Sequence, residues 1–165
     1  MKHLKGFVLC AALVFAAGGM AGAQTQMTST GTNYSTAIMS MNPIDAERVV
    51  GSQQLTGIRL DDSGKGPFHL LTTYVVCIFY GDKNGLQMRA FATEMDKDGD
   101  KVIWEIWDSP AGTPQGKGKL VGATGKFAGM EGTIDFEIQT PKGFPDSTGR
   151  VICREVWHVT LKNPL

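Results

Sequence analysis

Alternating apolar and polar residues predict β-strands along most of the chain. The clearest case is the segment 131–140, where Ile134, Phe136 and Ile138 alternate with polar or charged residues. Successive side chains of a strand point to opposite faces, so this pattern is typical of a strand with one buried face. The other segments with strand-like alternation, or rich in β-branched and aromatic residues, are 53–60, 68–80, 86–95, 101–107, 119–123 and 150–161.

Turn-forming residues separate these segments. Gly, Asp, Asn and Pro cluster at 61–67, 81–85 and 96–100, and Asn84-Gly85 is a strong hairpin signal. Seven or eight strands joined by short turns indicate an antiparallel meander, and closure into a barrel removes its two exposed edges. We therefore predict an all-β fold, a small antiparallel up-and-down β-barrel of about eight strands, with a sandwich as the alternative.

The N-terminus has a different pattern. Lys2 and Lys5 precede an uncharged apolar run at 7–17, and Ala21-Gly22-Ala23 offers a small-residue cleavage site. This order is typical of a bacterial secretory signal peptide, and the run is too short to span a membrane. The alternative is an uncleaved N-terminal anchor.

This pattern divides the chain into three parts. We expect residues 1–23 to be a signal peptide, residues 24–52 to form a flexible leader that leads into the fold, and residues 53–165 to form the barrel domain. The mature protein would then be periplasmic or extracellular, with no membrane span left after cleavage.

Composition narrows the function classes. The chain has 165 residues, which is enough for one ordinary domain, and 42% of them are hydrophobic. Its 16 basic and 16 acidic residues balance, which argues against a nucleic-acid partner. The 21 glycines favour many tight turns.

Cys77 and Cys153 are the two cysteines that remain after signal cleavage. In an oxidising compartment two cysteines most simply form a disulfide. The alternative is a pair of buried thiols that behave as small apolar side chains.

A glycine-rich stretch at 122–132, with the sequence GATGKFAGMEG, lacks the patterns of a phosphate-binding loop. Its glycines are better explained as turn formers before the strand that follows. The stretch resembles the glycine-rich run of the allene oxide cyclase and dirigent-like barrels. Other pieces follow the order found in small secreted bacterial relatives. They are Gly66-Pro67-Phe68-His69, then Cys77, then the acidic turn at 96–101. The resemblance spans about 53–162.

The resemblance implies an eight-stranded calycin-like barrel with a central apolar cavity, and a homotrimer as one possible assembly. It implies neither an activity nor a catalytic residue, because plant cyclases close a fatty-acid epoxide whereas dirigent proteins steer phenoxy-radical coupling. No catalytic residue of either family can be matched here, so the catalytic residues stay unknown.

Two patterns could suggest a metal site. Asp96, Asp98 and Asp100 have the spacing of the first ligands of a calcium loop, but Lys101 and Trp107 stand where glycine and glutamate are needed. We therefore predict a hairpin turn. The mature chain's two histidines show no zinc-binding spacing, so we expect no metal and no cofactor.

Polar residues within apolar strands are the best candidates for a binding site. Glu94 and Glu105 interrupt two middle strands, and Arg154 shares one face of the last strand with His158. The alternative for each charge, taken singly, is that it faces outward, as in any half-buried strand. We predict that Arg154 and His158 face the lumen near His69 and Tyr74, as the polar end of an apolar ligand pocket. In the competing register Cys153, Glu155 and Trp157 face inward instead.

Three functions remain open. The first is a secreted barrel that binds a small hydrophobic molecule, and the second is a cyclase or isomerase that works in a dry cavity. The third is a structural or interaction barrel with a filled core. The lumen discriminates between them, because only the first two need room for a ligand.

Overall fold

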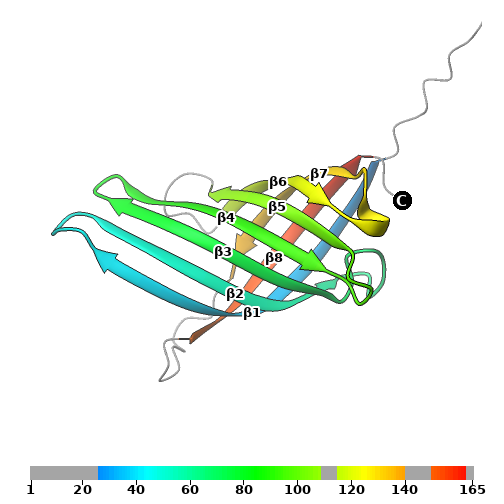
Figure 1. Ribbon diagram of the computed structural model, residues 1–165, viewed down its shortest axis with the longest axis horizontal. Coiled ribbons are helices and arrows are strands. Elements are labelled where there is room, and N and C mark those ends of the chain that lie inside the picture. The colour runs from blue at the N-terminus through cyan, green and yellow to red at the C-terminus, as the bar shows by residue number, and fades with distance from the viewer. Residues whose placement is uncertain (1–25, 109–114, 140–149, 163–165) are drawn as a thin grey trace, which may run out of the picture.

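The chain folds into a closed barrel of eight antiparallel strands, each hydrogen-bonded to its neighbours in sequence, with the last strand paired to the first (Figure 1). The computed structural model describes residues 26–108, 115–139 and 150–162. The strands are β1 (Gln26–Pro43), β2 (Val49–Asp61), β3 (Leu71–Asp82), β4 (Gly85–Met95), β5 (Lys101–Asp108), β6 (Gln115–Ala123), β7 (Glu131–Ile138) and β8 (Arg150–Lys162), with a 3-10 turn, η1 (Gly125–Phe127). The predicted all-β barrel is confirmed, and the sandwich alternative is wrong.

The prediction that 24–52 is a flexible leader is wrong. Most of this segment is β1, which pairs with β2 on one side and with β8 on the other. The hydrophobic pattern of the sequence does not reveal β1, because several of its inward-facing side chains are small and polar. These include Ser29, Asn33 and Ser35, which are all buried. Residues 44–47 form a bend between β1 and β2.

Residues 1–25 lie outside the described part of the chain, so the signal peptide and export stay predictions. Within the described part, no helix has the length and apolar character needed to cross a membrane.

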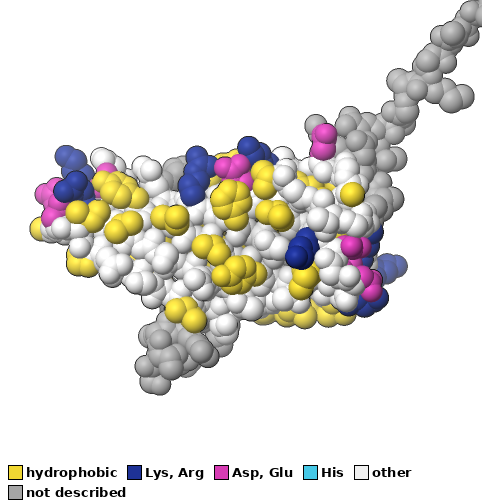
Figure 2. All heavy atoms as spheres, viewed as in Figure 1, with side chains coloured by type: hydrophobic (Ala, Val, Ile, Leu, Met, Phe, Trp, Pro, Cys, Tyr) yellow, Lys and Arg dark blue, Asp and Glu magenta, His cyan; other side chains and the backbone are white. Residues whose placement is uncertain are grey.

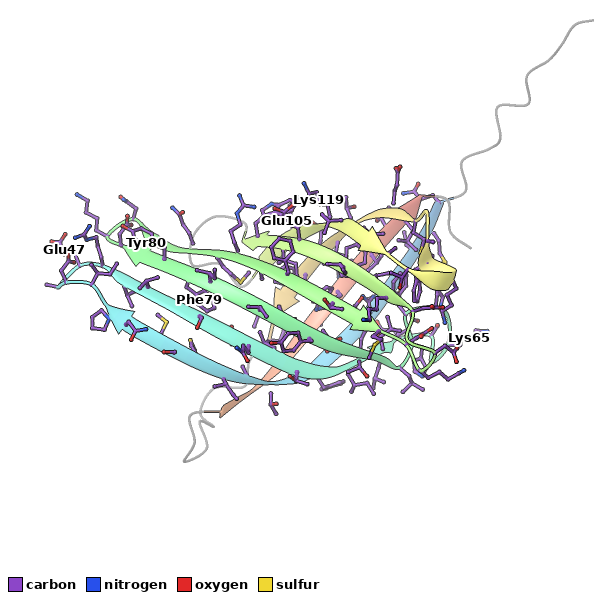
Figure 3. All side chains as sticks on the ribbon, in the orientation of Figure 1. Glu47, Lys65, Phe79, Tyr80, Glu105 and Lys119 are labelled. Carbon is purple, nitrogen blue, oxygen red and sulfur yellow. The ribbon has the colours of Figure 1, made fainter. Side chains whose placement is uncertain are left out.

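The barrel interior follows from strict alternation. Along β3, alternate side chains are buried, namely those of Leu71, Thr73, Val75, Cys77 and Phe79, whereas the side chains between them are exposed. Figure 3 labels one inward and one outward residue of this strand, Phe79 and Tyr80. Trp104 and Trp157 are the largest fully buried side chains and anchor the core from β5 and β8.

One end of the barrel is closed by loop residues. Phe68, from the β2–β3 connection, stacks on Phe127 of η1 with ring centroids 6.0 Å apart, and both rings are fully buried. The glycine-rich stretch makes this closure possible, because Gly125 and Gly129 have φ of 55° and 83°. Glycine adopts these left-handed angles without the penalty that other residues incur. The prediction that these glycines form turns is confirmed.

The acidic segment 96–100 is a turn, as predicted. The Asp96 carboxylate accepts the backbone N–H groups of Asp98 at 2.8 Å and Asp100 at 2.9 Å. Its other oxygen lies 2.5 Å from Lys126 Nζ, and this hydrogen bond is the main reason that the pKa of Asp96 is lowered. Among the described residues no group of three side chains could hold a metal ion. The turn therefore uses its carboxylate to tie η1 to the β4–β5 connection.

We predict that Gly125→Ala destabilises the barrel more than Gly129→Ala. Both substitutions place a Cβ in the left-handed region, but only a Cβ at position 125 would collide with the Asp100 carboxylate. The left-handed conformation alone costs about 1–2 kcal/mol, and the collision adds to it at position 125. Urea unfolding of both variants measures the difference. Equal losses would show that the carboxylate moves aside without cost.

Candidate functional site

A fully buried ion pair lies inside the barrel. Arg59 projects inward from β2 and Glu94 from β4, and both side chains have 0% exposure. Arg59 Nη1 lies 3.4 Å from Glu94 Oε1, which spans the intervening strand β3. The second carboxylate oxygen of Glu94 accepts a hydrogen bond from Trp104 Nε1 at 3.0 Å. Each charge is thus compensated, as burial requires.

Aromatic rings and a hydroxyl surround the rest of the guanidinium. Its carbon lies 5.1 Å from the centroid of Phe68 and 5.8 Å from that of Trp157, within the range of cation–π attraction. Arg59 Nη2 donates to Ser29 Oγ at 3.5 Å. Arg59 therefore joins strand β2 to β1, to β4 and to the loop residue that closes this end of the barrel.

Asp61 extends this network toward the surface. Its carboxylate accepts hydrogen bonds from Ser29 Oγ and Ser63 Oγ, both at 2.5 Å. Burial by itself would raise the pKa of Asp61, but the bonds from Ser29 and Ser63, with the nearby Arg59 charge, hold the pKa below its ordinary value. Asp61 is therefore ionised at neutral pH, and the network holds one cation and two carboxylates.

A small apolar pocket occupies the lumen on the other side of the ion pair. Its buried walls include Leu55, Val75, Ala90 and Trp157, and the cavity volume is about 20 Å³. That is room for about one water-sized group. The remaining lining residues are Gln53, Cys77, Met88, Ile106, Phe136 and Ile138. Gln53, Met88 and Ile138 are half-buried, so they form the accessible rim.

The strand register places the pocket directly beside the polar network. Leu55 pairs with Val75, and the next inward pair along the same strands is Gly57 with Thr73. Thr73 in turn pairs with Glu94 on β4. The lumen thus changes from apolar to polar within one step along the strands.

Two of the predicted pocket residues face outward. Tyr74 is 44% exposed, because Thr73 and Val75 on either side of it point inward. His158 is also exposed, and its Nδ1 lies 3.1 Å from Thr30 Oγ1 on the outer surface. The prediction that these two side chains face the lumen is therefore wrong. The competing register is the one observed, since Trp157 is buried.

The predicted proximity of His158 to His69 and Tyr74 is also wrong. Because β1 lies between β8 and β2, the neighbour of His158 on that side is Thr30 rather than a residue of β3. His69 is half-buried in the β2–β3 connection and is not part of a strand. Arg154 pairs with Tyr34 in the register, but its side chain lies outside the described part of the structure. A ligand-binding role for Arg154 stays a prediction.

The proposed disulfide also stays a prediction. Cys77 is buried and lines the apolar pocket. The side chain of Cys153 is not described, and two strands, β1 and β2, separate β8 from β3. A disulfide between them would therefore have to cross the lumen.

Sequence reasoning missed Arg59 and recognised only half of the pair. Glu94 interrupts an apolar strand, which marked it as a candidate for the lumen. Arg59 is an even number of residues after Leu55, so both side chains lie on the same, inward face of β2. This spacing was the available signal. Nothing in the linear sequence connects the two, since they meet only across β3.

We predict that Glu94→Gln destabilises the fold by about 3–5 kcal/mol, because it leaves a buried guanidinium without its counter-charge. The control is Glu105→Gln. Glu105 lies 3.1 Å from Lys119 on the outer wall, where the two residues are labelled in Figure 3. Exposed pairs of this kind contribute about 0–1 kcal/mol. Denaturant unfolding compares the two variants, and similar losses would show that Arg59 does not depend on Glu94.

Comparisons with known proteins agree with this architecture. No protein-family model matches the chain, and no curated protein is similar to it in sequence at a significant level. Among solved structures, the pterocarpan synthase dirigent protein GePTS1 superposes with a TM-score of 0.50 at 12% identity, covering 86% of this chain and 94% of that one. The resemblance to the dirigent-like barrels is confirmed at the level of the fold: the chain is an eight-stranded antiparallel barrel of the dirigent type.

Proposed function

We propose that this barrel binds a small hydrophobic molecule in its lumen. The observation that carries the proposal is the apolar pocket, whose walls are buried and which ends at a buried polar network. Ligand pockets typically combine apolar walls with a few convergent polar groups. An eight-stranded barrel has an interior just wide enough either to be filled by side chains or to hold one small ligand.

The pocket can enlarge at its rim. Its cavity of about 20 Å³ admits only a water-sized group, so a ligand must displace side chains. Met88 is half-buried at the rim, and methionine repacks more readily than branched residues do. Beside it, Ala90 on the same strand and Cys77, its cross-strand partner on β3, are small, which leaves the space for a ligand on the β3–β4 side.

A cyclase or isomerase is the second candidate, because an ionisable pair lies beside the pocket. Arg59 and Glu94 are fully buried and compensate each other, which is the low-dielectric setting in which an acid or base acts strongly. Binding without turnover requires less of the site and is therefore the function we propose first.

We predict that ethylbenzene binds the wild-type lumen and that Ala90→Leu weakens this binding at least about tenfold, because the longer side chain fills the pocket. Thr93→Leu is the control: it lies on the same strand with the opposite parity and should leave binding unchanged. Titration followed by NMR shifts of the Leu55 and Val75 methyl groups measures both. If the wild type shows no methyl shifts, the barrel has a filled core and the structural alternative holds.

We further propose that the barrel associates with copies of itself through an outer apolar patch. The patch comprises Val50 and Ile58 on β2, Val76 and Ile78 on β3, and Phe91 on β4, each exposed by 38–62%. Val76 and Phe91 are cross-strand neighbours, so the patch is continuous between β3 and β4. Figure 2 shows hydrophobic side chains gathered on this face, with charged groups toward its margins.

The chemistry of the rest of the wall favours a second copy as the partner. The outer surface of β5–β7 carries ion pairs, Lys119 with Glu105 and Lys117 with Asp135. Because the patch itself carries no charged side chain, patch against patch avoids burying unpaired charge. Exposed apolar patches of this kind commonly mark protein interfaces.

We predict that Ile78→Lys shifts the protein toward monomer, because a buried ammonium opposes association. Val121→Lys introduces the same charge at an exposed apolar position on β6, outside the patch, and should not change the assembly. Sedimentation velocity over a range of concentrations measures the stoichiometry. A wild-type protein that stays monomeric throughout would contradict the proposal.

A further inference from the structure

The polar side of the lumen contains hydrogen-bonding atoms that no described group satisfies. Arg59 Nε, Ser35 Oγ and Thr73 Oγ1 have no hydrogen-bond partner among the described residues. Their residues are exposed by only 0%, 4% and 0%. Buried polar atoms almost always have a partner in native proteins, so three such atoms in one region imply an occupant, either water or part of a ligand.

The register brings these atoms to one place. Ser35 on β1 and Thr73 on β3 both pair with Gly57 on β2, which lies between them. Arg59 is the next inward residue after Gly57 on the same strand. All three atoms therefore surround a position in the lumen wall that carries no side chain.

Gly57 cannot be replaced by a larger residue unless β1 moves. A Cβ at residue 57 would lie 2.3 Å from the Tyr34 carbonyl oxygen and 2.6 Å from Ser35 Cβ, so any side chain here would displace the residue that carries the Ser35 hydroxyl. The adjoining inward pair, Leu55 with Val75, lines the apolar pocket, so the three polar atoms lie next to the pocket along the same strands.

We propose that this position, which we call the hydroxyl subsite (Ser35, Thr73 and Arg59 Nε), binds an oxygen atom at the end of the hydrophobic ligand, and that the oxygen is neutral, as in a ketone, aldehyde or ether. This inference rests on the proposed lumen binding and names the class of ligand. Two hydroxyls and one N–H can all donate to a single acceptor.

The charges around the subsite decide between a neutral and an anionic ligand. The Arg59 charge is already compensated by Glu94, at 3.4 Å, and by Asp61, which shares Ser29 with it. The network of Arg59, Glu94 and Asp61 thus carries one positive and two negative charges. A carboxylate ligand would add a third negative charge in a low-dielectric interior, which is unfavourable. A neutral oxygen meets no such repulsion.

Three probes of nearly equal size test this proposal: ethylbenzene without oxygen, acetophenone with a neutral carbonyl, and benzoate with a charged carboxylate. Methyl NMR titrations of the wild type should rank acetophenone above ethylbenzene by about fivefold, the gain typical of one net hydrogen bond, and benzoate below both. If benzoate binds most tightly, the charge argument is wrong.

Variants separate the subsite from the pocket as a whole. Thr73→Val should remove most of the preference for acetophenone without changing ethylbenzene binding, whereas Thr73→Ser keeps the hydroxyl and should retain the preference. Thr72→Val, on the outward face of the same strand, is the matched control. Thermal unfolding of each variant shows whether it is folded. If Thr73→Val does not fold, Ser35→Ala provides an independent test from β1.

The possible results bear on different claims. A preference for acetophenone that survives both Thr73→Val and Ser35→Ala would overturn the subsite, because the ketone oxygen would then bind elsewhere. Binding of ethylbenzene with no preference for the ketone would also overturn the subsite but leave lumen binding intact. Absence of binding by all three probes would overturn the proposed function and the subsite together.

Discussion

The buried contact between Arg59 and Glu94 is the constraint on which the interior of this barrel depends. Two opposite charges without solvent exposure must stay paired, because either charge alone would be strongly unfavourable in the core. Their residues belong to β2 and β4, so the contact also fixes how these strands curve around β3. Trp104 and Ser29 extend the same set of hydrogen bonds to β5 and β1, and four of the eight strands are therefore joined from inside.

This arrangement divides the lumen into unlike halves. On one side, aromatic rings from the connecting loops cover the guanidinium and close the barrel. On the other, small and branched apolar residues leave a narrow pocket. A molecule that enters from the rim first contacts apolar walls and then a polar floor. The outer wall is divided as well, with an apolar face on β2–β4 and ion pairs on β5–β7.

The sequence predicted the fold class because most strands obey a simple rule, and β7 shows it best, with Ile134 and Phe136 inward and charged residues outward. The rule failed for β1, where the buried residues are themselves polar. It was also ambiguous for β8, since apolar residues occur on both faces, and only the position of β1 as its neighbour decides which face is inward. Glu94 was recognisable as unusual within its strand, but its partner was not, because 35 residues separate them and only the register across β3 brings them together.

The closure of the barrel by its two terminal strands has a consequence for how the chain reaches its native state. The pairing of β1 with β8 runs from Gln26–Lys162 to Ile38–Arg150, so it joins residues from opposite ends of the sequence. Such contacts have a high entropic cost until the intervening strands are in place, which makes topologies of this kind slow to fold. The segment made first during synthesis therefore waits for the segment made last, and until then β1 has only one of its two partners.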